Sequence, residues 1–403
     1  MNIIIGKNGT GKTTFMNILH AVLAVDLDGL YENIFRGVTI ILTDGKRTRT
    51  IRADRVEHPN SFPRIEYHIS NRRFTAPLVG IEDVRMMPAS IRRRAIEESQ
   101  RIKQELGKLV SVASLSVYRI GGDTDPELRE RYPKRLASTV DLRLDSLMQQ
   151  LTQYQLEISN EARVISAQLQ RDVLLSLLYT EEKKTEQSFK LDFDENVERH
   201  NLVIAYRQLG VGGTDISRKI QDHIAAVTAS ITNIKAQSGE HKDGKEFFAK
   251  LDVNFAALEA FRLTRKVVEK SLAAEQKTKL IFGQIDLFLT ILKTFVTDKN
   301  FTFSAGELNV ANEDPIPLAK LSSGEKQLLI LFIEALLQRK EPYIFLADEP
   351  ELSLHISWQR NIIAAIRSLN PSAQIIVATH SPEIAGKFRD CILDMEDILH
   401  GKS

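Results

Sequence analysis

The sequence predicts an α/β fold: a head with a mixed sheet that includes an antiparallel β patch, and a helical hairpin or coiled-coil arm inserted between the two halves of the head. Three observations predict it. A short apolar segment, residues 2–5, runs into a glycine-rich loop that opens a helix. Residues 138–182 contain no Gly or Pro, and their apolar residues recur at a mean step of about 3.6. From residue 321 onward, helical and strand patterns alternate.

The first half of the head is assigned to residues 1–135. It begins with a buried strand and a helix whose apolar positions follow helical spacing. Short segments separated by turn residues then predict the antiparallel patch, and a charged helix and one more strand complete this half. The expected elements are a strand at 2–5, a helix at 13–25, strands at 38–42, 48–53, 64–70 and 73–77, a helix at 89–106 and a strand at 109–118.

The arm is assigned to residues 136–300. A straight helix over residues 138–182 would extend about 67 Å at about 1.5 Å per residue, which is longer than a globular core requires. A glycine-rich loop at 210–213 breaks the helical pattern, and helices at 215–236 and 245–297 lead back toward the head. The arm is therefore expected to be helical and hairpin-like.

The second half of the head is assigned to residues 301–403. Its alternating helices and strands are typical of a parallel α/β half. The expected elements are a strand at 301–310, a helix at 324–338, a strand at 343–347, a helix at 357–369 and a strand at 375–378.

Composition limits the classes of function. With 43% hydrophobic and 27% charged residues, the chain of 403 residues can bury a large core. Its 54 basic and 53 acidic residues give a net charge of +1, so no overall field attracts nucleic acid or a membrane. The single cysteine, Cys391, excludes an internal disulfide and fits a reducing compartment. No apolar stretch reaches the roughly 18 residues of a membrane span, so a cytoplasmic protein without a membrane partner is expected.

The segment from Gly6 to Thr13 matches the pattern G-x-x-x-x-G-K-[ST] between a strand and a helix, which is the context that a phosphate-binding loop requires. Backbone N–H groups of such a loop wrap the β-phosphate, and the helix N-terminus adds its dipole. Lys12 would bridge the β- and γ-phosphates of ATP, and the Thr13 hydroxyl would bind Mg²⁺. A simple glycine-rich turn is the alternative, but the strand and helix on either side favour the phosphate loop of a P-loop NTPase. The predicted nucleotide-binding residues are Gly6, Asn8, Gly9, Thr10, Gly11, Lys12, Thr13 and Thr14.

Two carboxylates, Asp348 and Glu349, end an apolar strand that begins at Tyr343. This places both at the carboxyl edge of a parallel sheet, where ligands bind. Asp348 is the second predicted Mg²⁺ ligand. Glu349 would orient and deprotonate the attacking water, and with Lys12 it belongs to the predicted catalytic set. A strand that merely ends in solvated acids is the alternative, which the phosphate loop in the same chain disfavours.

The segment 321–327, Leu-Ser-Ser-Gly-Glu-Lys-Gln, precedes a helix and resembles the L-S-G-G-x-Q signature of ATP-binding-cassette (ABC) proteins. Its L-S-x-G-E form is similar to the SMC and RecF branch rather than to membrane transporters. In that family the signature contacts the γ-phosphate bound by the opposite subunit, so two incomplete sites become two complete ones. The alternative is a Ser-capped helix without a ligand. The resemblance implies that the residues facing the partner's nucleotide are Ser322, Ser323, Gly324 and Glu325.

Two further segments follow in the order of that family. Residues 350–355 resemble the D-E-P-E-x-x-L-H run of the RecF-like branch and would line the seam between paired heads; for His355 a helix-cap role is equally expected. A buried strand ends at Thr379-His380-Ser381, which resembles the switch histidine and implies that His380 senses the γ-phosphate and holds the attacking water. No Gln stands where the family has its Q-loop, and Arg119 occupies that position.

The head resembles ATPases of bacterial anti-phage systems such as PARIS, Septu or retron modules. This resemblance implies a homo-oligomer formed through ATP-sandwiched heads, which senses a trigger and controls a partner effector. The chain ends at residue 403, soon after His380, so any nuclease or toxin is expected to be a separate protein acting in trans. The alternative function is a DNA-repair or replication ATPase that clamps duplex DNA. Its possible DNA contacts, the arginines at 92–94 and 129–135, are interleaved with acids, which favours a solvated surface.

Overall fold

The computed structural model describes residues 1–400 except residues 44, 46, 59–60, 79–88, 116–138, 177–192, 238–253, 305 and 353. The chain divides into two compact units. The first, here called the head, comprises Met1–Tyr154 and Ile285–Ser403, and the second, the arm, comprises Gln155–Gln284.

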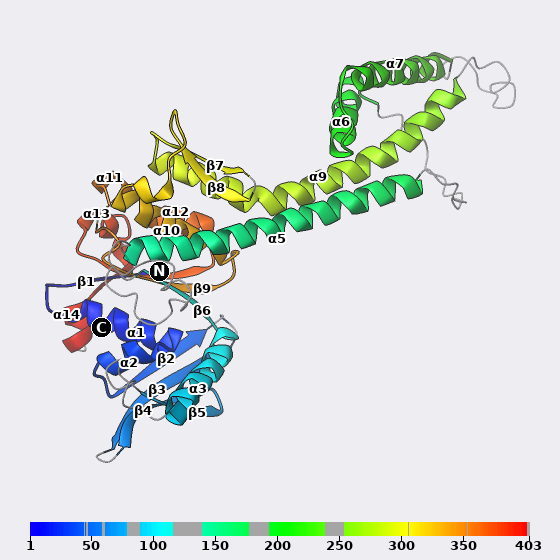
Figure 1. Cartoon of the computed structure of the whole chain (residues 1–403). Helices are drawn as coiled ribbons and strands as arrows, with labels where there is room; N and C mark the ends of the chain where they lie inside the picture. The colour runs from blue at the N-terminus through cyan, green and yellow to red at the C-terminus, as the bar shows by residue number, and fades with distance from the viewer. Residues whose placement is uncertain are drawn as a thin grey trace. The chain divides into compact units, whose positions relative to one another are not determined.

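The centre of the head is a five-stranded sheet in the order β11-β1-β10-β9-β6. Its strands β1, β9 and β6 are labelled in Figure 1. All neighbouring strands in it are parallel. Because Ile4 pairs with Ala378 and Ala378 pairs with Asp348, strands β1, β10 and β9 end at the same level. The loops that follow them therefore lie at one edge of the sheet. The strands are β1 (Asn2–Ile5), β6 (Ser111–Leu115), β9 (Tyr343–Asp348), β10 (Ala373–Ala378) and β11 (Ile392–Asp394).

The antiparallel patch is a second sheet, in the order β2-β3-β4-β5. Its strands are β2 (Gly37–Thr43), β3 (Thr48–His58), β4 (Ser61–Ile69) and β5 (Arg72–Pro77). Ile51, Ile65 and Tyr67 on one face are fully buried, whereas β2 alternates between exposed and half-buried residues. The predicted α/β class is confirmed, with one difference: the parallel and antiparallel strands form separate sheets rather than one mixed sheet, because a helix packs between them.

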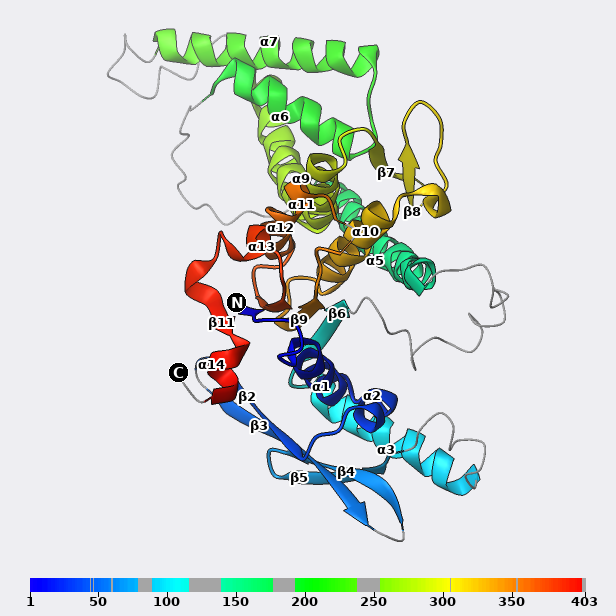
Figure 2. The same cartoon turned by 90° about the vertical axis from the view of Figure 1, so that its left-hand side faces the viewer.

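That helix is α1 (Lys12–Ala24), which contacts the parallel sheet and shares a core with the antiparallel sheet. Its Met16 and Val22 are buried in the same cluster as Ile51 and Ile65. The Tyr67 hydroxyl donates a 2.9 Å hydrogen bond to the Val22 carbonyl, and burial raises the pKa of Tyr67, so the phenol stays protonated as a donor. Helices α2 (Leu27–Glu32) and α3 (Ala89–Gly107) flank this layer (Figure 2).

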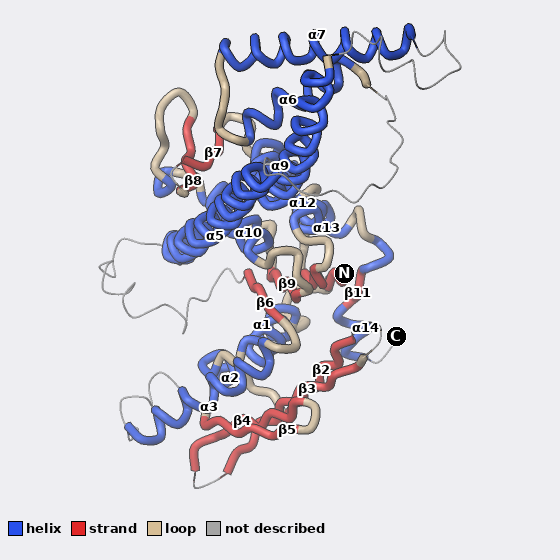
Figure 3. The backbone as a smooth tube through the Cα atoms, turned by 90° about the vertical axis from the view of Figure 1, so that its right-hand side faces the viewer, coloured by secondary structure: helices blue, strands red, loops and turns tan. Residues whose placement is uncertain are grey.

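The opposite face of the parallel sheet is covered by α10 (Ser323–Leu337) and α12 (Ile362–Leu369). Figures 1 and 3 show α1 and α10 on opposite faces of the sheet. Nearly all of α10 is buried. Three short helices complete this half: α11 (Ile356–Gln359), α13 (Pro382–Ala385) and α14 (Met395–His400).

Two predicted elements of this half are wrong in detail. The strand expected at 301–310 is a hairpin of β7 (Asn300–Ser304) and β8 (Glu307–Ala311), because Gly306 adopts a φ of +85° that permits a tight turn. The single helix expected at 357–369 is two helices. The Asn361 amide bonds the Trp358 carbonyl three residues back, and this tighter turn separates α11 from α12.

The arm is helical, as predicted. Helices α5 (Thr139–Ser176) and α9 (Phe255–Phe295) cross the boundary between head and arm, and the Lys270 ammonium of α9 bonds the Asp172 carbonyl of α5. Helix α7 (Thr214–Gln237) matches the prediction, whereas α6 (Glu195–Gln208), capped by Asp194, was not predicted. The helices expected at 138–182 and 245–297 extend beyond α5 and α9. Most of the residues in these extensions lie outside the described ranges. Among the helices of the described residues, none has the length and hydropathy of a membrane span.

Candidate functional site

The loop between β1 and α1 has the backbone of an anion cradle. Gly9 and Gly11 adopt φ values of +82° and +90°, a region that other residues enter only with strain. A Cβ on Gly6 would lie 3.0 Å from the Thr10 hydroxyl oxygen and 3.1 Å from the Met395 Cβ, so a side chain there would crowd the loop. Helix α1 has no side-chain cap, so its first N–H groups remain for an anionic ligand.

Lys12 lies in the middle of this cradle. Its ammonium donates to the carbonyls of Gly6 at 2.8 Å and Lys7 at 3.0 Å, and the residue is only 5% exposed. The Thr10 hydroxyl also donates to the Lys7 carbonyl, at 2.9 Å. Because a buried ammonium needs such partners, these bonds hold the lysine folded over the loop. The cradle is thus preshaped, with a positive charge at its centre.

Asp348 lies beside the start of α1 and combines the features of a cation ligand. Burial raises the pKa of Asp348, and the nearby carboxylates of Glu349 and Glu351 raise it further. A hydrogen bond with the Thr13 side chain lowers this pKa, but the net shift is upward. Its Oδ1 is buried without a hydrogen-bond partner among the described residues. An unpaired carboxylate oxygen next to a threonine hydroxyl fits Mg²⁺, which prefers oxygen ligands. Across the described ranges no three His, Cys, Asp or Glu side chains gather into a group that could hold a metal ion.

Glu349 and His380 face each other across the ends of β9 and β10. The Glu349 Oε1 lies 3.7 Å from the His380 Nε2, and both side chains are about one-third exposed (34% and 39%). Glu349 has a φ of +48°, and its amide is fixed by the Ala378 carbonyl at 2.8 Å. Such a backbone costs on the order of 1 kcal/mol or more in a residue other than glycine, and backbone strain of this kind clusters at functional sites.

The signature segment forms the N-terminus of α10, on the face of the sheet opposite α1. Ser322 caps the helix: its hydroxyl accepts from the Glu325 amide at 3.3 Å, and the Glu325 carboxylate accepts from the Ser322 amide at 2.8 Å. Lys299 forms a 2.5 Å ion pair with that carboxylate, which is 8% exposed. In the part of the chain that the structure describes, no hydrogen bond or ion pair joins Ser322 or Glu325 to the phosphate loop or the acid pair.

The contacts of Glu325 lie within its own chain. One oxygen of its carboxylate accepts from the Lys299 ammonium and the other from the Ser322 amide. Burial raises the pKa of Glu325, but the hydrogen bonds from Lys299 and Ser322 outweigh it and the net shift is downward. Ser322 itself accepts through its oxygen and keeps its O–H free to donate.

The ion pair between Lys299 and Glu325 is expected to stabilise the fold around the start of α10. Lys299→Met removes the cation from a buried carboxylate, so the free energy of unfolding should fall by about 1–3 kcal/mol at neutral pH. Because the folded-state pKa of Glu325 is lowered, its contribution is present above the unfolded-state pKa and is lost as pH falls. The difference between variant and wild type should therefore shrink below roughly pH 4.

Urea unfolding of both proteins at pH 7 and at the lowest pH where they fold measures this difference. Lys320→Met is the matched control, because Lys320 is an exposed lysine just before the signature residues. An equal loss of stability in the two variants at pH 7 would contradict the assignment.

Both long helices are joined to the signature helix where they enter the head. From α5, Arg143 bonds the buried Glu334 of α10 at 2.6 and 3.0 Å. From α9, the Phe295 ring packs edge-on against the Phe332 ring of α10, with centroids 5.1 Å apart. Burial raises the pKa of Glu334, Arg143 lowers it, and the net shift is upward. The two long helices, α5 and α9, therefore both contact α10, whose N-terminus carries the signature.

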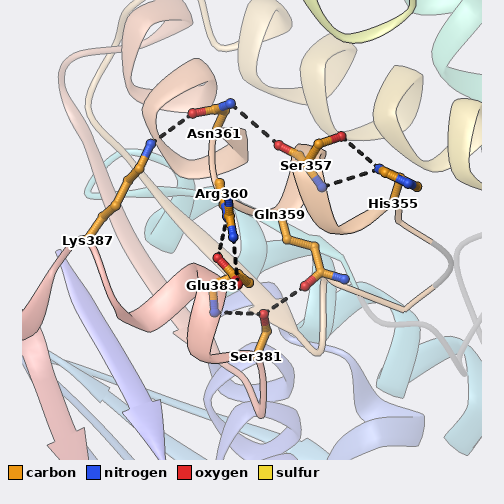
Figure 4. A network of polar contacts seen from close by, with 8 residues as sticks. All are labelled: His355, Ser357, Gln359, Arg360, Asn361, Ser381, Glu383 and Lys387. Atoms are coloured by element: carbon orange, nitrogen blue, oxygen red, sulfur yellow. Dashed lines mark hydrogen bonds and ion pairs between the residues drawn. The ribbon is translucent and has the colours of Figure 1, made fainter.

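The loop between Glu349 and α11 contains contacts that the sequence did not predict. One Glu351 carboxylate oxygen accepts three hydrogen bonds from residues 379–381. His355 caps α11 by accepting from the Ser357 amide at 3.3 Å, which bears out the helix-cap alternative. Figure 4 shows the surrounding polar network, in which Gln359 meets Ser381 and Arg360 meets Glu383. The predicted Q-loop position, Arg119, lies outside the described residues.

Comparisons with known proteins place the chain in a family. The family described as AAA ATPase domain matches residues 1–385 of the chain. The Escherichia coli protein "Retron Ec83 probable ATPase" is 33% identical over 89 residues, which are 22% of this chain and only 16% of that protein.

Among solved structures, two Smc heads are similar over 95% of this chain. One is the Pyrococcus furiosus Smc head with an extended coiled coil bound to the C-terminal domain of ScpA (14% identity, 84% of that chain, TM-score 0.40). The other is the Pyrococcus yayanosii Smc head with a coiled coil and joint (17% identity, 88% of that chain, TM-score 0.36).

Proposed function

This chain belongs to the AAA ATPase domain family, and on that premise we propose that it hydrolyses ATP in centres that two copies of the chain complete together. The observation that carries the proposal is the meeting of three loops at one edge of the parallel sheet: the phosphate loop, the pair Asp348 and Glu349, and the loop of His380. Ser322 belongs to a different set of contacts, on the other face of the sheet. One head therefore holds a phosphate cradle and presents its signature to another head's nucleotide.

The phosphate loop is proposed to bind the ATP phosphates. Its glycine conformations turn backbone N–H groups inward, and the uncapped start of α1 adds further donors. Lys12, now held by the Gly6 and Lys7 carbonyls, would exchange these neutral partners for the β- and γ-phosphates. The Lys12 ammonium interacts more strongly with negatively charged phosphate oxygens than with neutral carbonyls, which favours this exchange.

Mg²⁺ is the cofactor that this site fits. Thr13 and Asp348 would hold it, because the threonine hydroxyl and the unpaired Asp348 oxygen are adjacent oxygen ligands. Bound there, the ion would offset the negative charge that develops on the phosphates.

Glu349 and His380 are proposed to act on the attacking water. Their facing atoms are 3.7 Å apart, so one water can contact both side chains. Glu349 accepts the water's proton, and His380 orients the water and contacts the γ-phosphate. The strained backbone of Glu349 holds its carboxylate in place before substrate arrives.

The second head supplies what the first lacks. Ser322 would donate its free O–H to the γ-phosphate across the seam, with the first N–H groups of α10 beside it. Ser323 and Gly324 belong to that first turn. Glu325 is proposed to hold this cap in shape rather than to touch nucleotide. Two identical heads facing each other would therefore form two complete centres.

The output is proposed to be conformational. Because α5 and α9 both contact α10, closing one signature onto another head's nucleotide would shift the stems of the arm. In an anti-phage system this movement would control a separate nuclease or toxin. The similarity to "Retron Ec83 probable ATPase" over 89 residues supports this proposal.

Purification of the tagged chain from cells that carry its native neighbouring genes, followed by mass spectrometry, tests the proposed effector. The expected result is a stoichiometric protein with a nuclease or toxin fold whose recovery changes with ATP. Recovery of the chain alone, with ATPase activity stimulated by duplex DNA and strongly reduced by salt, would instead support the DNA clamp. In the described part of α3, Arg101 is paired with Glu98, which favours a solvated surface there.

A further inference from the structure

The Glu351 carboxylate accepts three hydrogen bonds beside the candidate site. Its Oε1 accepts from the Thr379 hydroxyl at 2.6 Å, the His380 amide at 2.8 Å and the Ser381 amide at 3.1 Å. Its Oε2 is buried without a hydrogen-bond partner among the described residues. Hydrogen bonds to an ionised acceptor are roughly twice as strong as neutral ones, so these three fix the loop after β10 firmly.

These bonds act on the backbone of His380 rather than on its ring. The three donors belong to consecutive residues, and His380 is the middle one. Its Nε2 remains free to face Glu349 at 3.7 Å. A third residue, two positions after Glu349 in the chain, therefore anchors the backbone that carries His380.

A second tie joins the same two segments. The Ser381 hydroxyl donates to the Gln359 side chain at 2.7 Å (Figure 4). The Gln359 amide donates to the Leu354 carbonyl at 3.0 Å. The Leu354 amide in turn bonds the Glu351 carbonyl at 3.0 Å. The loop of His380 is thus bound at both ends to residues 350–355, the segment proposed to line the seam between heads.

We infer that Glu351 is a positioning residue, which holds His380 at its working distance from Glu349 and links that distance to the segment facing the second head. The inference rests on the proposed function, because it assigns His380 a role in hydrolysis. It adds a physical route by which head pairing changes turnover: a shift of residues 350–355 against the partner moves Glu351, and Glu351 moves the His380 backbone. A residue that served only to stabilise the fold would affect protein yield and stability, but not turnover through His380.

The test compares Glu351→Ala, His380→Ala and the double variant in the full-length chain, by steady-state ATP hydrolysis. Glu351→Ala should lower kcat by about 10²-fold, since a small misplacement of a catalytic group has effects of this size. KM should change by less than about 3-fold, because the phosphate loop is untouched. The double variant should be no slower than His380→Ala, because both changes remove the same contribution.

Glu351→Gln is the conservative control. Its side-chain oxygen can accept the same three hydrogen bonds, so kcat should remain within about 10-fold of wild type. If Glu351→Ala does not fold, Thr379→Val and Thr379→Ser replace it. The valine removes the shortest of the three hydrogen bonds and should lower kcat, whereas the serine keeps the hydroxyl and should not.

The outcomes separate this inference from the proposed function. If His380→Ala is slow but Glu351→Ala, or Thr379→Val in its place, turns over ATP like wild type, the inference is wrong and the proposed function stands. A double variant that multiplies the two losses would also overturn the inference, because Glu351 would then act independently of His380. Full activity of His380→Ala would contradict both.

Discussion

Glu349→Gln is expected to lower ATP turnover by about 10² to 10⁴-fold, the range that removal of a general base produces. ATP affinity should not fall, because the phosphate loop and Lys12 are unchanged. Since the variant cannot complete hydrolysis, paired heads should accumulate around uncleaved ATP. Phosphate release measures turnover, and light scattering after size exclusion with Mg²⁺ and ATP measures the pairing.

The matched control for this experiment is Lys12→Ala. It removes the ammonium from the cradle, so ATP binding and pairing should both be lost. The two variants would then be equally inactive for opposite reasons, one trapped as a dimer and one monomeric. Equal turnover in wild type and Glu349→Gln would refute the assignment of Glu349 as the base.

Ser322→Arg is expected to leave ATP binding by each head intact while it abolishes ATP-dependent pairing and nearly all turnover. The serine caps α10 at the surface proposed to meet the other head, and a bulky side chain would block close approach there. Loss of the cap also costs about 1 kcal/mol, which lowers stability without unfolding the head. A fluorescent ATP analogue measures binding, and light scattering measures pairing.

Lys320→Arg places the same side chain two residues earlier, at an exposed position, and should pair and hydrolyse ATP like wild type. If Ser322→Arg hydrolysed ATP as fast as this control, the signature would have no role across the seam.

The parts of the site that lie within one motif could be predicted from the sequence. The phosphate loop is such a case, because its glycines, Lys12 and Thr13 follow one another along the chain. The meeting of Asp348 and His380 with this loop also follows from sequence, since parallel strands end at one sheet edge.

The contacts that the sequence did not predict join residues far apart in the chain. Lys299 meets Glu325 across 26 positions and Glu351 meets Thr379 across 28, and neither pair forms a local pattern. Helix α6 is different, because Asp194 followed by Glu195 is a helix-start signal that could have been used. The two sheets are separate because α1 packs between them. The pattern of apolar residues within a strand does not predict such packing.

The dependence of turnover on protein concentration tests most directly the claim that each centre needs two copies of the chain. ATP hydrolysis per head should be measured over a dilution series that spans the range in which heads separate. The account predicts that turnover per head falls toward zero on dilution and rises to a plateau as pairing is completed. A turnover per head that stays constant from the most dilute monomer to the concentrated protein would contradict it.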